Sequence, residues 1–79
     1  MSLEEAELNL EESRALVAKA EEIAERLREA RDSCTGQAWE DADRRYTAVK
    51  GRVKAMRREL AEFEEFVFEW ALDQTLAEL

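Results

Sequence analysis

The strongest constraint on the fold is an apolar repeat in the second half of the chain. Its members alternate steps of three and four residues without a slip from Trp39 to Ala77, and Gln74 is the only polar one. A repeat of this period is typical of a helix that packs along one continuous seam. We therefore expect a helix over residues 37–78, about 60 Å long at the usual rise per residue. The predicted seam residues are Trp39, Tyr46, Val49, Val53, Met56, Leu60 and Phe63.

The first half carries an apolar stripe that predicts another helix, over residues 2–31. From Leu16 the stripe runs through Ile23 and Leu27 to Cys34 at helical spacing. Ser2 and Glu5 match a capping box, in which each side chain satisfies a backbone donor of the other residue. The pattern therefore places the start of this helix at residue 2 or 3.

Residues 32–36 predict a turn between the two helices. The segment is rich in turn-forming residues, and Gly36 can adopt a positive φ. The first stripe, extended past Cys34, lands on polar residues, so the two helical faces are out of phase here. One continuous helix is the alternative, because Pro is absent and four-residue steps can bridge the gap. We expect an all-α fold of one domain, residues 1–79, built as an antiparallel two-helix hairpin that assembles into an antiparallel dimer or four-helix bundle.

The residue types exclude most catalytic and metal chemistry. The chain has no His and one Cys, Cys34. Zinc sites, Ser-His and Cys-His pairs and an internal disulfide therefore lack their residues. Carboxylate pairs such as Glu62 and Glu65 have helical spacing but lie off the seam. We expect a protein that is not an enzyme, without catalytic, cofactor-binding or metal-binding residues and without a cofactor, in which Cys34 is a small buried residue at the turn.

Apolar residues near the C-terminus exceed what the first helix can cover. Folding the chain at residues 33–36 places Leu3 roughly opposite residue 66, which leaves the end of the second helix without a partner. Exposed clusters of this kind usually mark an interface. A bend near Asp73, which would let the second helix cover itself, is the alternative. The expected partner interface consists of Phe66, Val67, Phe68, Trp70, Leu72, Leu76 and Leu79.

Charge is segregated along the second helix. Residues 44–58 hold seven bases and no acid, whereas residues 59–79 hold seven acids and no base. Two such helices, crossing antiparallel near Arg58, would set the acidic block of each chain against the basic block of the other and so define orientation and register. We expect an antiparallel homodimer, or a helical protein partner in place of the second copy. The residues expected to set the register are Arg44, Arg45, Arg57, Arg58, Glu62, Glu65 and Glu69.

The overall charge bears on other classes of partner. A formal net charge of −8 argues against general nucleic-acid binding, and the acidic polar face of residues 63–79 argues against anionic membranes. The alternative function is that of a phage or regulatory protein that binds a nucleic-acid-associated partner through its segregated charge. No apolar run is long enough to span a membrane, and the acidic start is unlike a cleaved signal. We expect a cytoplasmic protein, with signal-peptide-independent export as the alternative.

The segment Cys34-Thr35-Gly36-Gln37-Ala38, followed by Ala42, Tyr46, Val49 and Val53, resembles the WXG family of small type VII secretion substrates. Cys34 stands where that family has Trp. The resemblance covers roughly residues 16–63 and implies a helical hairpin that forms dimers and is exported without a cleaved signal. In size and exposed apolar face the chain is also similar to the helical co-chaperones of type III secretion needle subunits. We therefore expect a non-enzymatic interaction module, a small dimerising adaptor, chaperone-like or secretion-associated protein.

Overall fold

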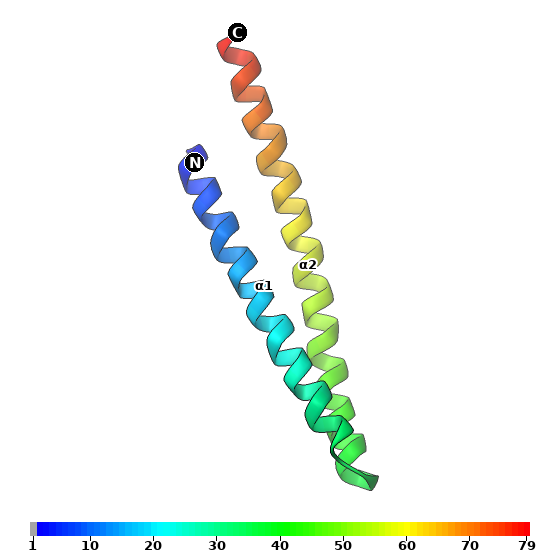
Figure 1. Cartoon of the computed structure of the whole chain (residues 1–79). Coiled ribbons are helices and arrows are strands. Elements are labelled where there is room, and N and C mark those ends of the chain that lie inside the picture. The colour runs from blue at the N-terminus through cyan, green and yellow to red at the C-terminus, as the bar shows by residue number, and fades with distance from the viewer. Residues whose placement is uncertain (1) are drawn as a thin grey trace.

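The computed structural model describes residues 2–79, and this part of the chain is all-helical. It consists of two helices, α1 over Leu3–Asp32 and α2 over Gly36–Glu78 (Figure 1). The bounds lie within one residue of those expected from the apolar repeats. The continuous-helix alternative is wrong, because α1 ends before the connecting residues 33–35.

The start of α1 has the Ser2 half of the expected capping box, and the described residues show no reciprocal bond from the Glu5 side chain to the Ser2 N–H. The Ser2 hydroxyl accepts a hydrogen bond of 3.2 Å from the backbone N–H of Glu5. The Ser2 carbonyl also accepts from the N–H of Ala6, at 3.0 Å. Glu4 and Glu5 place negative charge in the first turn, where the helix dipole favours it. Local side chains therefore define where α1 begins.

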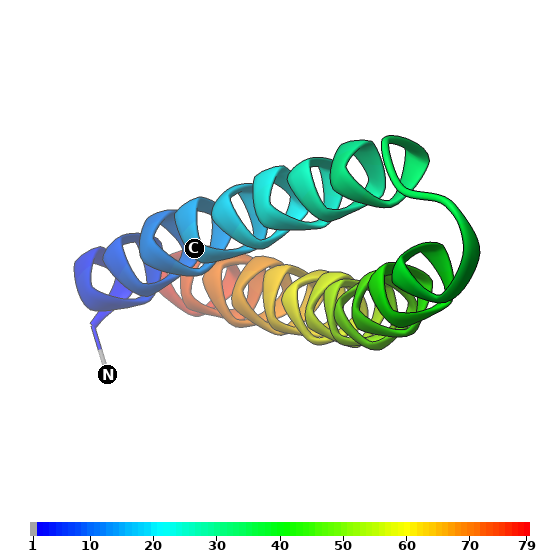
Figure 2. The same ribbon diagram turned by 90° about the horizontal axis from the view of Figure 1, so that it is seen from below.

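The chain reverses direction through a short connection at residues 33–35 (Figure 2). The Ser33 hydroxyl donates a 3.0 Å hydrogen bond to the Glu29 carbonyl, and the Cys34 N–H donates to the Arg31 carbonyl. Both bonds satisfy carbonyls at the open end of α1. Gly36 then adopts a φ of 61°, as the turn requires.

The two helices lie side by side along the rod, and the start of α1 and the end of α2 lie toward the same end of it (Figure 1). The rod measures 64 × 15 × 15 Å. Ion pairs tie the helices at three levels: Arg14 to Glu64, Glu21 to Arg57, and Arg31 to Asp43. These pairs join progressively earlier residues of α2 to later residues of α1, and so define the register between the helices.

The buried core is small. Its members are Ala6, Leu10, Val17, Val53 and Val67. One cluster joins Ala6, Leu10 and Val67, with Leu60, Phe63 and Trp70 packed against it in a half-buried state. Two helices alone cannot enclose a large side chain, and among the described residues none is fully buried. Most apolar side chains of the seam therefore keep part of their surface in solvent.

The inner face of α1 differs from the one expected. Leu16 is 62% exposed and Ile23 45% exposed, although both belong to the predicted stripe. The observed inner face passes through Val17 instead, and it also contains Ser13 and Arg31 as half-buried polar members. The predicted stripe changes phase between Leu10 and Leu16, whereas the observed face keeps steps of three and four from Ala6 to Cys34. Its other half-buried members are Ala20, Ala24, Leu27 and Cys34.

The register between the helices also corrects the expected partner interface. Val67 is only 5% exposed and packs against Ala6 and Leu10, and Trp70 packs on the same cluster. Both residues therefore belong to the core of the chain and not to a free surface. The sequence-based estimate assumes that both helices begin directly opposite each other at residues 33–36. In the structure the first turn of α2 lies beyond the end of α1, since Arg31 pairs with Asp43. The unpartnered end of α2 consequently starts after Ala71.

Candidate protein interaction surface

The two long edges of the rod, on either side of the helix–helix seam, differ in character. One edge, which we call the charged edge, carries Arg14, Glu21, Arg57 and Glu64. The Arg57 Nε donates a 2.8 Å hydrogen bond to Glu21, and the Arg14 Nε lies 3.4 Å from Glu64. The Arg57 guanidinium lowers the pKa of Glu21 by this hydrogen bond and by its charge, while desolvation opposes the shift. Ion pairs therefore bridge the two helices along this edge, and grooves remain beside both of them, one lined in part by Arg14 and Glu64 and another in part by Glu21 and Arg57.

The opposite edge carries exposed apolar side chains on α1 and Phe66 on α2, beside charged residues of α2, and we call it the apolar edge. Leu16 and Ile23 are seven residues apart on α1, and Phe66 follows Glu59 by seven on α2, so each pair falls on one line along its helix. Leu16, Ile23 and Phe66 are all substantially exposed. Between the helices this edge holds a groove with a largely apolar lining. The groove is lined by Ser13, Leu16, Val17, Met56, Glu59, Leu60 and Phe63.

A second apolar surface lies on the end of α2. Phe68, Leu72, Leu76 and Leu79 follow one another in steps of four, four and three, so they share one helix face. We call them the C-terminal stripe. All four are exposed, with Phe68 69% exposed. The end of α2 extends past the start of α1 (Figure 1), and the alternative of a bend near Asp73 is not observed, since α2 continues to Glu78.

The expected seam of α2 lies largely against α1. Val53 is buried, and Tyr46, Val49, Met56, Leu60 and Phe63 are half-buried. Trp39 is 40% exposed, because it lies in the first turn of α2, next to the connection. The residues Phe66, Phe68, Leu72, Leu76 and Leu79 of the expected interface are exposed, in contrast to Val67 and Trp70.

Arg31 forms a polar cluster at the turn that the sequence did not reveal. Its Nη1 donates a 2.9 Å hydrogen bond to Asp43, and its Nε donates a 3.1 Å bond to Asp32. Its guanidinium carbon lies 4.8 Å from the ring centroid of Tyr46 and 5.7 Å from that of Trp39. The hydrogen bond to Asp43 is the main reason why the pKa of Arg31 is raised. In the sequence, the only indication that Arg31 contacts α2 is its position four residues after Leu27, on the inner face of α1.

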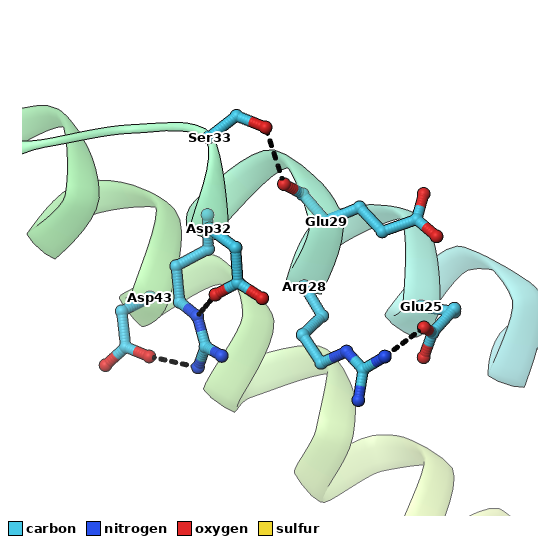
Figure 3. A network of polar contacts seen from close by, with 7 residues as sticks. Glu25, Arg28, Glu29, Asp32, Ser33 and Asp43 are labelled. Carbon is cyan, nitrogen blue, oxygen red and sulfur yellow. Dashed lines mark hydrogen bonds and ion pairs between the residues drawn. The ribbon is translucent and has the colours of Figure 1, made fainter.

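Figure 3 shows how these polar contacts gather around the end of α1, with Asp43 reaching toward the turn from α2. On the α1 side, Arg28 pairs with Glu25 and the Ser33 hydroxyl donates to the Glu29 backbone. The cluster therefore joins the end of α1 to α2 at the turn end of the rod.

The residues expected to set the register of a dimer are all on the surface. Arg57 pairs with Glu21 and Arg44 with Asp41, whereas Arg45 and Arg58 make no ion pair within residues 2–79. Two of the seven bases of residues 44–58 are therefore paired with carboxylates in the described chain. Exposed carboxylates complete the set at Glu62, Glu65 and Glu69.

The described part of the chain contains no group of three His, Cys, Asp or Glu side chains that could hold a metal ion. Cys34 is a free, half-buried thiol beside the turn. Neither helix of residues 2–79 has an apolar stretch that could cross a membrane. The surface features that stand out are therefore the apolar edge and the C-terminal stripe.

Comparison with known protein families, with curated proteins and with solved structures gives no match. The resemblance to the WXG family, which rests on residues 34–53, accordingly stays a prediction.

Proposed function

We propose that this protein is a non-enzymatic protein–protein interaction module, an antiparallel helical hairpin that associates with a second helical chain through its uncovered apolar surface. One observation carries this proposal. Five apolar residues form the buried core, while ten large apolar side chains are exposed by 40% or more. They lie mainly on the apolar edge and the C-terminal stripe. An imbalance of this size usually marks a surface that is covered by a partner.

The energetics support association. Full burial of one large apolar side chain contributes roughly 1.5–3 kcal/mol. Covering three or four of them therefore offsets much of the entropic cost of bringing two chains together. A hairpin with so small a buried core also has little free energy of unfolding of its own. A bound partner adds to that stability because it binds only the folded chain. Folding and association are therefore expected to be coupled.

Self-association is the first form of this function to test. The native mass of the full chain should be measured by light scattering or native mass spectrometry at two concentrations a hundredfold apart. We expect dimers at the higher concentration and dissociation on dilution. A mass of one chain at both concentrations would contradict self-association.

A truncation locates the surface that carries the association. Ending the chain after Ala71 removes most of the C-terminal stripe but keeps Val67 and Trp70, which stabilise the core. We expect weaker association and a circular dichroism spectrum that remains helical. Ending the chain after Glu65 would be a poor test, because it would also remove core residues.

Export is a second proposal, and it rests on the resemblance to the WXG family. It predicts that the chain reaches the medium of a host with a type VII secretion system without being cleaved. Retention in the cells, with normal retention of a cytoplasmic marker, would contradict it. The interaction module does not depend on this outcome.

A further inference from the structure

We propose that the partner on the apolar edge is a second copy of this chain, seated face to face and antiparallel, so that Leu16 of each copy packs on Ile23 of the other and Arg52 of each pairs with Glu59 of the other. This inference rests on the proposed function and specifies its interface. It begins from the difference between the two edges of the rod. On the charged edge the ion pairs Arg14–Glu64 and Glu21–Arg57 bridge the two helices. On the apolar edge no ion pair of the described residues crosses the groove, and the exposed Leu16 lines it.

The outermost residues of the apolar edge on α2 recur every seven residues and change in chemistry along the helix. Going along the helix they are Arg45, Arg52, Glu59 and Phe66. All four are exposed, and within residues 2–79 the three charged ones make no ion pair. A basic half followed by an acidic and aromatic half is self-complementary when two such lines run antiparallel.

A two-fold axis reproduces every contact twice, because residue i of one copy meets residue j of the other and the reverse. An axis that crosses α2 between residues 55 and 56 sets Arg52 against the partner's Glu59. It also sets Arg45 against the partner's Phe66, where a guanidinium can lie on the ring. The same arrangement places the basic block of each α2 against the acidic block of its counterpart.

The register on α1 follows from the same axis without further choice. Leu16 of one copy meets Ile23 of the other when the axis crosses α1 between residues 19 and 20. In the single chain this level of α1 lies beside residues 55–56 of α2, since Val17 and Met56 line one groove and Glu21 pairs with Arg57. One axis therefore satisfies the apolar pair on α1 and the charged pair on α2 together.

Four residues flank this axis, of which Ala20 and Ala55 are small and Lys19 and Met56 are longer. Ala20 is half-buried, and Ala55 and Lys19 are exposed. The arrangement also brings the end of each α2, with Leu72, to the level of the partner's exposed Trp39. The result is a four-helix assembly in which the open grooves at the middle of both rods cover each other.

A charge exchange tests this interface. In Arg52→Glu the two symmetric contacts become Glu against Glu, and in Glu59→Arg they become Arg against Arg. Each single variant should therefore dissociate at a concentration about tenfold or more above that of the wild-type chain. When the two variants are mixed in equal amounts, both contacts become Glu against Arg, and the mixture should associate. The double variant should associate with itself.

An apolar pair of variants provides the matched control. Leu16 and Leu8 are both exposed leucines on α1, 62% and 58% respectively, but only Leu16 lies on the apolar edge. We expect Leu16→Glu to abolish association and Leu8→Glu to leave it unchanged. Circular dichroism of both variants checks that the helices form.

The outcomes separate this inference from the proposed function. Loss of association in the single charge variants with recovery on mixing supports the interface. If the wild-type chain forms a dimer and Arg52→Glu, Glu59→Arg and Leu16→Glu all leave its association unchanged, the interface is overturned. The interaction module then still stands, with the C-terminal stripe as its remaining surface. A wild-type chain of one-chain mass at every concentration overturns both.

Discussion

Arg57 of α2 donates a 2.8 Å hydrogen bond to the carboxylate of Glu21 on α1 and thereby ties the two helices together near the middle of the rod. The two residues lie 36 positions apart in the sequence, so this contact exists only in the folded chain. It also makes the stability of the fold depend on pH.

The Glu21–Arg57 pair predicts an acid-sensitive contribution to stability. Because Arg57 lowers the pKa of Glu21 in the folded chain, the pair stabilises the fold above the ordinary carboxyl pKa of about 4.3. That contribution is lost as the pH falls through the lowered pKa. We expect Glu21→Gln to reduce the urea midpoint at pH 7 and to match the wild-type chain near pH 3. Glu12→Gln, at an exposed residue without an ion pair in the described chain, serves as the control for net charge.

The neighbours Val67 and Phe68 predict opposite phenotypes. Val67 is 5% exposed and Phe68 is 69% exposed. We expect Val67→Ala to lower the free energy of unfolding by roughly 1–3 kcal/mol through the lost burial and the cavity that remains. Phe68→Ala should change folding by less than about 0.5 kcal/mol and should weaken association instead. Urea unfolding at low protein concentration and native mass at high protein concentration separate the two effects. An equal loss of unfolding free energy in both variants would contradict the assigned burial.

The contacts of Arg31 predict that its removal would loosen the turn. Replacing Arg31 by Ala removes the hydrogen bonds to Asp43 and Asp32 and the contact with the Tyr46 ring. We expect a lower urea midpoint and a changed fluorescence spectrum of Trp39, measured in a Trp70→Phe background. Arg28→Ala, which removes only an ion pair within α1, is the control. Identical spectra for the two variants would contradict the role of Arg31.

The two glycines predict changes of opposite sign. Gly51 lies inside α2 with open space around the position that a Cβ would occupy, so Gly51→Ala should stabilise the fold by about 1 kcal/mol. Gly36 has a φ of 61°, and Gly36→Ala should destabilise it by about 1 kcal/mol or more. Thermal unfolding of both variants at one protein concentration checks the signs. Stabilisation by Gly36→Ala would show that the turn can be rebuilt without a positive φ.

Local patterns carried most of the information about secondary structure. The cap at Ser2, the glycine at residue 36 and the seam from Tyr46 to Phe63 each depend on residues close in the sequence. Their effects act within one or two helical turns. The observed helices accordingly match the apolar repeats to within one residue at their ends.

The sequence by itself determined that this chain forms two long helices with a turn between them, and that its apolar surface exceeds its core. Only the tertiary structure decided which face of α1 is inward and how far α2 overhangs. On α1 two stripes compete. The stripe through Leu16 is apolar throughout but changes phase after Leu10, whereas the stripe through Val17 keeps its period but includes Ser13 and Arg31. The choice is made by contacts with α2, where Val67 meets Leu10 and Arg31 meets Asp43. Such contacts join residues far apart in the chain, so their energy enters only when the helices pack.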